Sequence, residues 1–391
     1  MISVGEALEQ LRPLISPTSA DMVPIHEALG RVLSQNLRAT RTQPPFSASA
    51  MDGYAMRGSD VSAGAVLHVI GEAAAGHGFA GDVRPGTCVR IFTGAPVPEG
   101  ADHVVIQEDV DRTGDSITVR GDVGLGTNIR PAGADFVEGD GLGHRGPLSP
   151  AALALLAAMG HGTLPVHRKP VVALIPTGDE LVPPGAPIGP DQIVSSNSYG
   201  LAAQIIRAGG EPRILPIAPD RLDPLTATFA LAENADLIIT LGGASVGDHD
   251  LVKDVPDLDL AFYKIAMRPG KPLMAGRFRG TPMIGLPGNP VSAMVCGEIF
   301  VTPALAGFFD LPIQERTREQ ATLAAPLTAN GPREHYMRSV LHGDGAAAQV
   351  EVLPRQDSSL LSVLSRANAL TIRPIGDGVR NAGDSVEIIR L

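Results

Sequence analysis

Tryptophan is absent from this sequence, and aromatic residues make up only 4% of its 391 residues. Surfaces that bind nucleic-acid bases or sugar rings usually stack them on aromatic side chains, so the composition argues against both kinds of surface. The formal net charge of −11 also disfavours nucleic acid and anionic membranes as partners. It still permits an anionic small ligand, provided that the binding pocket is locally basic.

Cysteine is nearly absent as well. Cys88 and Cys296 lie far apart and lack the spacing of a metal site, so we expect buried thiols in a reducing cytosol and no disulfide framework. The N-terminal MISVGEALEQLRPLI is amphipathic and carries acidic residues, unlike a signal peptide. The apolar run AALALLAAMG is too short to cross a bilayer. These features predict a cytoplasmic protein with no membrane partner.

The composition and hydrophobic periodicity of the first 167 residues change twice along the chain. Residues 1–40 carry apolar residues at helical spacing and predict short helices. Residues 41–140 are rich in Gly, Pro and β-branched residues in short runs, which is typical of an all-β module. A Ser-Pro pair at 149–150 then begins another helix. We expect this helix to pack on the N-terminal helices, so that 1–40 with 141–167 form one discontinuous helical domain around the inserted β-rich module.

Strands alternate with helices from residue 168 to 315. VVALIPTG, EPRILPIAPD, DLIITLGG and PMIGLPGN are typical of strands, with helical segments between them. Such alternation predicts a parallel sheet with helices on both faces. Residues 316–391 return to short β-type runs, which fit a small antiparallel barrel or sandwich. We therefore expect a multidomain α+β and α/β chain.

Four loops of the α/β segment are candidates for a binding site, because ligands of open parallel sheets bind beyond the carboxyl ends of the strands. They are PTGDEL, VSSNS, GGASVGDHD and GLPGNPVS. Their glycines would let backbone N–H groups approach a phosphate or a pterin edge; the alternative is a set of structural turns with surface acids. The sequence has neither a P-loop nor a dinucleotide fingerprint. The candidate binding residues are Thr177, Gly178, Ser196, Asn197, Gly242, Gly243, Ser245, Gly247, Pro287, Gly288, Asn289, Pro290 and Ser292.

The segment KIAMRPGKP holds three cations, Lys264, Arg268 and Lys271, in a loop stiffened by Pro and Gly. A solvated charge run is one interpretation; a clamp for an oxyanion is the other. Acidic residues at Glu180, Asp248 and Asp250 would then hold Mg²⁺ or transfer protons. In the β-rich module, QPPFSASAMDGYAM forms a stiff loop that either presents the carboxylate of Asp52 or uses it in an Asp-Gly turn.

Seven motifs in this order resemble those of the MoeA family, the molybdopterin molybdenumtransferases, to which the gephyrin E domain and its plant counterpart are related. They are PPFSASAMDGYAM, IFTGAPVPEGADHVVIQED, PTGDELV, SSNSYGLAAQI, LGGASVGDHD, KIAMRPGKP and GLPGNPVSAMV. The resemblance implies an elongated homodimer with four domains per chain. These are a discontinuous helical linker and dimer domain (1–40 with 141–167), a β-rich inserted domain (41–140), a MogA-like parallel α/β domain that binds molybdopterin (168–315) and a C-terminal β-barrel (316–391).

The resemblance also implies an activity: insertion of molybdenum from molybdate into adenylylated molybdopterin, with release of AMP, in a Mg²⁺-dependent reaction. The substrates would be molybdate and adenylylated molybdopterin. The partners would be the molybdopterin adenylyltransferase and downstream molybdoenzyme maturation proteins. Two alternatives stay open: a molybdopterin adenylyltransferase, which would need only the α/β segment, and a non-catalytic scaffold of the same fold.

Residue roles follow from the family motifs. Glu180 and Asp250 are the expected Mg²⁺ ligands. Arg268 stands where some relatives carry lysine, which keeps the charge and changes the donor geometry. The residues implied for catalysis are Asp52, Thr93, Asp135, Glu180, Asp220, Asp250, Lys264, Arg268 and Lys271, and those implied for molybdate are Lys271, Pro272, Arg338 and Ser358.

Overall fold

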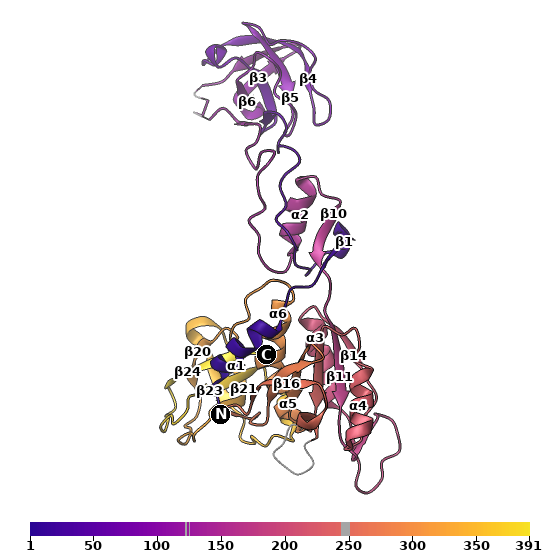
Figure 1. Ribbon diagram of the computed structural model, residues 1–391. Helices are drawn as coiled ribbons and strands as arrows, with labels where there is room; N and C mark the ends of the chain where they lie inside the picture. The colour runs from indigo at the N-terminus through magenta and orange to yellow at the C-terminus, as the bar shows by residue number, and fades with distance from the viewer. Residues whose placement is uncertain (122, 125, 244–250) are drawn as a thin grey trace. The chain divides into compact units, whose positions relative to one another are not determined.

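The computed structural model describes residues 1–391 except 122, 125 and 244–250. The chain folds into two compact units (Figure 1). Unit 1 comprises residues 1–21, 30–34 and 165–391, and unit 2 comprises residues 22–29 and 35–164. The first and last crossings between the units fall within β1 (Ala20–Pro24) and β10 (Thr163–His167).

Unit 1 contains the predicted α/β sheet. The strand order is β14-β11-β15-β19-β18-β16, and the first four strands are parallel. The strands are β11 (Val171–Pro176), β14 (Glu211–Ile214), β15 (Leu237–Leu241), β16 (Leu258–Tyr263), β18 (Met274–Phe278) and β19 (Thr281–Leu286). The short strands β12 (Leu181–Val182) and β13 (Ile193–Val194) pair separately.

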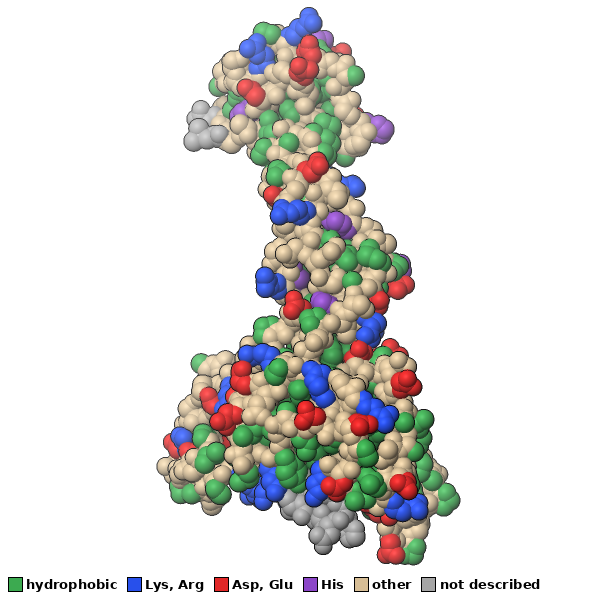
Figure 2. All heavy atoms as spheres, viewed as in Figure 1, with side chains coloured by type: hydrophobic (Ala, Val, Ile, Leu, Met, Phe, Trp, Pro, Cys, Tyr) green, Lys and Arg blue, Asp and Glu red, His purple; other side chains and the backbone are tan. Residues whose placement is uncertain are grey.

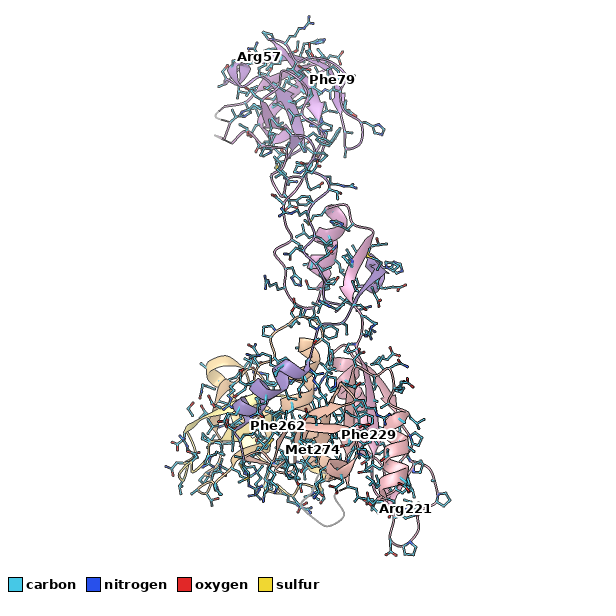
Figure 3. All side chains as sticks on the ribbon, viewed as in Figure 1. Arg57, Phe79, Arg221, Phe229, Phe262 and Met274 are labelled. Carbon is cyan, nitrogen blue, oxygen red and sulfur yellow. The ribbon has the colours of Figure 1, made fainter. Side chains whose placement is uncertain are left out.

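Helices cover both faces of this sheet, as the sequence predicts. Alternate residues of a strand point to opposite faces. Val172 and Leu174 of β11 therefore join one core together with α3 (Asn197–Arg207), while Ala173 and Ile175 join the other together with α4 (Leu222–Ala230). Phe229 of α4 and Met274 of β18 belong to the second core and Phe262 of β16 to the first (Figure 3).

Two antiparallel strands extend the sheet beyond what the alternation of strands and helices predicts. β18 runs antiparallel to β19, and β16 antiparallel to β18. The connection between β18 and β19 has only two residues, Arg279 and Gly280, both with positive φ (47° and 88°). Two-residue turns with positive φ at both positions match the strand twist of a hairpin, so the chain reverses here instead of crossing over through a helix.

The longest apolar helix is part of the unit 1 core. α5 (Pro290–Cys296), the π-helical turn Gly297–Val301 and α6 (Thr302–Gly307) follow one another directly. In the part of the chain that is described, Pro290–Gly307 is the one helix long and apolar enough to span a membrane, and 78% of it is buried within the protein. Contact with the sheet accounts for its apolar composition.

The C-terminal strands close into a barrel, which decides between the two predicted architectures. The order β21-β22-β20-β24-β23 is closed by pairing of β23 with β21. β17 (Met267–Arg268), from the α/β segment, adds to β21 in parallel. The other elements are β20 (Glu319–Leu323), β21 (Glu334–His342), β22 (Gln349–Val352), α7 (Leu361–Leu364), β23 (Ala369–Arg373) and β24 (Ser385–Arg390).

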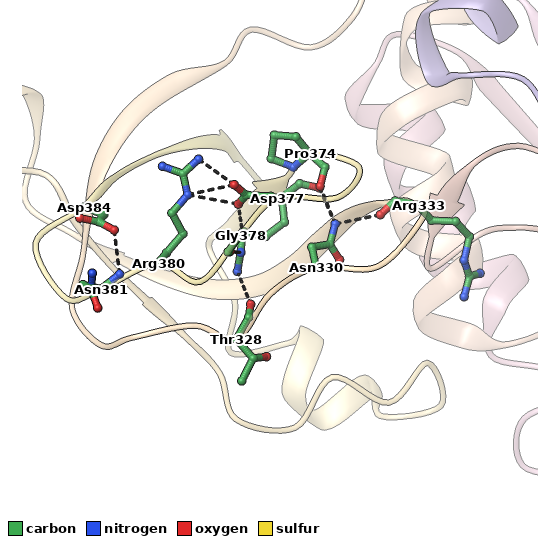
Figure 4. Close-up of polar contacts among 10 residues, drawn as sticks. Thr328, Asn330, Arg333, Pro374, Asp377, Gly378, Arg380, Asn381 and Asp384 are labelled. Carbon is green, nitrogen blue, oxygen red and sulfur yellow. Dashed lines mark hydrogen bonds and ion pairs between the residues drawn. The ribbon is translucent and has the colours of Figure 1, made fainter.

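A buried polar network braces the loops at one end of the barrel (Figure 4). Arg373 forms an ion pair with Asp377, and both side chains are almost fully buried (2% and 8% exposed). Arg373 also donates to the carbonyl oxygen of Thr328 at 3.1 Å, and Asn330 donates to the carbonyl oxygen of Arg333 at 2.9 Å. The segment leading into β21 is thereby fixed to the segment following β23.

The N-terminal helix differs from its predicted packing. α1 (Val4–Leu11) begins with a capping box in which Ser3 and Glu6 each hold the backbone N–H of the other. Its buried residues, Val4 and Leu8 among them, belong to the unit 1 core, so α1 packs on the α/β and barrel elements. The expected second helix is only a 3₁₀ turn, Ile25–Glu27, because Pro24 and the positive φ of Gly30 leave room for a single turn.

Unit 2 contains the predicted all-β module. Its main sheet has the order β6-β3-β5-β4-β8-β7. The elements are β2 (Ala48–Ser49), β3 (Gly53–Met56), β4 (Val66–Ala73), β5 (Thr87–Ile91), β6 (His103–Ile106), β7 (Val110–Thr113), β8 (Ser116–Val119), β9 (Ile129–Arg130) and α2 (Pro150–Ala158). α2 is followed by Met159, which packs with Ala39 and Phe136. The proposed four-domain boundaries remain a prediction.

Candidate active site

A cavity in unit 1 collects residues from the loops that the sequence singles out. It lies at the carboxyl ends of β11 and β15, next to the starts of α3 and α5. The Asn197 side chain donates to the carbonyl oxygen of Gly288 at 2.7 Å and so joins the two helix starts. Six predicted residues line the cavity: Thr177, Glu180, Ser196, Asn197, Gly288 and Pro290.

Gly242 sits where a side chain would collide with the neighbouring loop. Its φ is 108°, and an added Cβ would lie 2.7 Å from both the carbonyl oxygen and the hydroxyl of Thr177. The loop after β15 thereby rests directly on the loop after β11. Among the other predicted binding residues, Pro287 and Ser292 are buried, and Asn289 is exposed at the N-cap position of α5.

The loop after β11 also holds the segment that carries Asp220. Asp179 accepts a hydrogen bond from the backbone N–H of Asp220 at 3.1 Å, and Gly178 donates to the carbonyl oxygen of Ala218 at the same distance. Asp220 and Glu180 are thus carried by two adjoining loops. Asp179 was not among the predicted site residues, although its place beside Glu180 in PTGDEL is a usable signal.

Backbone hydrogen bonds join the two ends of the basic loop, residues 264–272, and strand pairing attaches the loop to the barrel. The N–H of Lys264 donates to the carbonyl of Leu273 at 2.9 Å, and the N–H of Ile265 to that of Lys271 at 3.2 Å. The β17–β21 pairing sets Arg268 opposite His335. In the described part of the chain, neither Arg268 nor Lys271 forms an ion pair. Acidic and basic side chains are otherwise interspersed over the visible face of unit 1 (Figure 2).

Arg338 of β21 is the most unusual cation in the described structure. Its side chain is fully buried, and its Nη2 donates to the carbonyl oxygen of Asp357 at 3.0 Å. Its Nε and Nη1 have no partner among the described residues. Burial, followed by the charge of Arg268, lowers the pKa of Arg338 to about 10. A buried cation without a carboxylate is costly, so this guanidinium suits a bound anion.

Ser358 directly follows Asp357, whose carbonyl oxygen accepts the hydrogen bond from Arg338. The carbonyl oxygen of Ser358 accepts the N–H of Val291 at 2.9 Å, which ties the segment after β22 to the start of α5. His335, which the sequence did not single out, is also nearby and buried, and its Nε2 has no partner among the described residues. Burial and then the charges of Arg268 and Arg338 lower the pKa of His335 to about 4, so the imidazole is neutral at pH 7.

Unit 2 holds the remaining predicted residues. Asp52 precedes β3, and its carboxylate accepts hydrogen bonds from both the backbone N–H and the hydroxyl of Thr93. Asp135 lines a separate cavity with Arg130 and Phe46. Ser245, Gly247, Asp248 and Asp250 lie outside the described residues.

Neither cysteine is available for chemistry at these sites. Both thiols are free and buried, as predicted, and burial raises the pKa of Cys88 to about 12. Within the described ranges, no group of three His, Cys, Asp or Glu side chains is arranged to hold a metal ion. Glu180 is the one expected Mg²⁺ ligand that the structure describes.

The fold and its cavities define a class: a chain with a MogA-like α/β domain, a β-rich module and a C-terminal barrel with a buried cationic site. Three family descriptions match it in order. They are "MoeA N-terminal region (domain I and II)" over residues 2–160, "Probable molybdopterin binding domain" over 173–307 and "MoeA C-terminal region (domain IV)" over 320–391.

Curated relatives and solved structures agree. Molybdopterin molybdenumtransferase 2 of Mycobacterium tuberculosis is 38% identical over 382 residues, 94% of this chain and 92% of that protein. The molybdopterin molybdenumtransferase of Bacillus subtilis is 31% identical over 402 residues, 99% and 94% of the two chains. The molybdopterin biosynthesis MoeA protein of Pyrococcus horikoshii superposes with a TM-score of 0.85 at 29% identity, covering 100% of both chains. The chain belongs to the MoeA family of molybdopterin molybdenumtransferases.

Proposed function

We propose that this enzyme transfers molybdenum from molybdate to adenylylated molybdopterin and releases AMP. The observation that carries the proposal is Arg338, a fully buried guanidinium with two unpaired nitrogens in a chain of net charge −11. A tetrahedral dianion supplies the acceptor oxygens and the charge that this group lacks.

The molybdate site would be completed by the basic loop. Lys271 and Arg268 are exposed, form no ion pair in the described part of the chain, and belong to a loop fixed at its base. A preorganised loop loses little conformational entropy when the anion binds. Ser358 would contribute its hydroxyl, and Pro272 would stiffen the turn beside Lys271.

The cavity lined by Thr177, Asn197 and Gly288 would take the pterin and its phosphates. Phosphate oxygens would accept hydrogen bonds from the backbone N–H groups at the start of α3, an 11-residue helix. The dipole of this helix favours negative charge at that end. The dithiolene sulfurs belong to the substrate, since both protein thiols are buried.

Mg²⁺ fits the donor set of this cavity. Glu180 is an exposed carboxylate in the lining, and Mg²⁺ is commonly held by one or two carboxylates together with substrate phosphates. The ion would neutralise charge on the adenylate while its bond to the pterin phosphate is broken. Glu180 would hold Mg²⁺, with Asp250 as the second expected ligand from the sequence. The other residues that the family motifs imply for catalysis are Asp220 and Lys264 in unit 1 and Asp52, Thr93 and Asp135 in unit 2.

Incubation of the purified chain with adenylylated molybdopterin and Mg²⁺ tests the proposal. We expect AMP release that depends on molybdate and yields a molybdenum-containing pterin. Accumulation of adenylylated pterin from molybdopterin and MgATP would instead identify the adenylyltransferase alternative. A folded chain that does neither, and that fails to restore molybdoenzyme activity in an insertase-deficient host, would be a scaffold.

Family membership also supports a cytoplasmic homodimer that receives its substrate from the molybdopterin adenylyltransferase and passes its product to molybdoenzyme maturation proteins. Light scattering at micromolar concentration tests the dimer directly. A monomer over the whole concentration range in which the enzyme is active would overturn it.

A further inference from the structure

We propose that Gln356 is a positioning residue of the molybdate site, which it serves by locking the loop at residues 354–360 onto β21 beside Arg338. This inference rests on the proposed function. It concerns a side chain with no expected contact to either substrate, and it explains how a buried arginine is kept without a carboxylate partner.

The side-chain amide of Gln356 forms two hydrogen bonds with the backbone of Arg338, one as acceptor and one as donor. Its Oε1 accepts the N–H of Arg338 at 3.0 Å, and its Nε2 donates to the carbonyl of the same residue at 2.9 Å. The same Nε2 also donates to the carbonyl of Leu353 at 2.7 Å. One amide thus reproduces the paired donor and acceptor of a neighbouring strand, so the loop is held in register with β21 at this residue.

The hydrogen bonds of Gln356 also position the two residues that follow it. The carbonyl of Asp357 accepts Nη2 of Arg338 at 3.0 Å, and the carbonyl of Ser358 accepts the N–H of Val291 at 2.9 Å. The loop therefore joins β21 to the start of α5. Ser358 is brought to the site by the same segment that fixes one nitrogen of the guanidinium.

The carboxylate of Asp357 forms its hydrogen bonds with Ser359 and none with Arg338 in the described structure. Its Oδ1 accepts the N–H and the hydroxyl of Ser359 at 2.8 and 2.6 Å, and these bonds lower the pKa of Asp357. Arg338 consequently bonds the backbone of Asp357 and forms no ion pair with its carboxylate in the described structure. A loop free to shift could let that carboxylate neutralise Arg338, which would compete with molybdate. The amide, being neutral, fixes the loop without adding a competing charge.

The test uses the full chain and molybdate as the probe. Gln356→Met keeps the side-chain length and removes all three hydrogen bonds. Gln356→Glu keeps an acceptor for the Arg338 N–H but has no donor and adds a negative charge. Gln349→Glu is the matched control, because Gln349 is exposed on β22 and makes the same charge change in the same barrel.

We expect Gln356→Met to raise the molybdate Kd by calorimetry, and the KM for molybdate, about tenfold, the scale of one or two lost hydrogen bonds between neutral groups. Gln356→Glu should weaken molybdate binding further, while Gln349→Glu binds like the wild type. The KM for adenylylated molybdopterin should stay within about twofold in all three, because that substrate contacts other loops.

A double-mutant comparison separates positioning from general stability. If Gln356 acts through Arg338, adding Gln356→Met to Arg338→Met should cost little further molybdate affinity. Unchanged molybdate binding in both Gln356 variants, or a parallel loss for molybdate and pterin, would overturn the inference. If Gln356→Met fails to fold, Gln356→Leu, which is equally uncharged and also lacks the three hydrogen bonds, takes its place. Failure of the wild type to bind molybdate would instead count against the proposed function.

Discussion

The carboxylate of Asp52 takes two hydrogen bonds from one residue, Thr93, whose backbone N–H and hydroxyl both lie 2.8 Å from the same oxygen, Oδ1. These bonds lower the pKa of Asp52, the backbone bond having the larger effect. The group is therefore ionised at neutral pH and held in one orientation. Two residues that the family motifs single out separately act as one unit.

Asp52→Asn should abolish most of the activity without unfolding the protein. The amide is isosteric but uncharged, and loss of a positioned acid or base typically costs about a hundredfold or more in kcat. Thr93→Val keeps the backbone N–H bond and removes only the hydroxyl, so its effect should be smaller. Steady-state kinetics with circular dichroism checks both variants; wild-type turnover by folded Asp52→Asn would exclude the role.

Glu180→Gln should raise the Mg²⁺ concentration needed for half-maximal activity by roughly tenfold to a hundredfold, because one carboxylate ligand is lost. Its melting temperature should match the wild type, since Glu180 is exposed. Asp191→Asn, an exposed acid outside the cavity lining, is the matched control. A Mg²⁺ titration of AMP release measures all three proteins. The same half-activating concentration for Glu180→Gln and the wild type would rule out metal binding by Glu180.

Arg338→Met should separate stability from function. A buried cation that lacks an anionic partner carries a desolvation cost that no ion pair offsets, so the variant without molybdate should unfold at the same or a higher denaturant concentration. Its KM for molybdate should rise roughly tenfold to a hundredfold. At one molybdate concentration, the anion should stabilise the wild type against denaturant far more than Arg338→Met. Equal protection of both proteins would show that the anion binds elsewhere.

Asp377→Asn should destabilise the barrel by about 3–5 kcal/mol, because it leaves the buried guanidinium of Arg373 without its charge partner. Hydrogen bonds from Arg380, and then from Arg373, lower the pKa of Asp377 in the folded state. The stability that this carboxylate provides is present above its unfolded pKa of about 3.9 and is lost as the pH falls through the lower folded value. Denaturant unfolding from pH 7 to pH 3 should therefore show the gap between wild type and variant closing with acid.

The exposed residue Asp344 supplies the control for that series. Its side chain is 85% exposed and pairs with Arg390 at the surface. Asp344→Asn should change the free energy of unfolding by no more than about 1 kcal/mol. A loss as large as that of Asp377→Asn would mean that burial is not the cause.

Local sequence patterns predicted the elements of the α/β segment and the loops at their ends. Strand runs closed by glycine turns gave β11, β15 and β19 at their predicted places, because apolar runs and turn residues act within a few positions. The antiparallel strands β16 and β18 were not predicted. Their direction depends on a two-residue turn whose positive φ values only the folded chain displays.

The sequence by itself determined that acids and cations flank glycine turns in one α/β segment, and that the order of motifs is that of the MoeA family. It could not bring Arg338 within electrostatic reach of Arg268, since these residues are far apart in the chain and the pairing of β17 with β21 sets Arg268 opposite His335, on the same strand as Arg338. Nor could it reveal that Arg338 is buried with unpaired nitrogens, or that the Gln356 side chain forms hydrogen bonds with the backbone of Arg338. Those features depend on barrel closure, which long-range strand pairing decides and which no local pattern encodes.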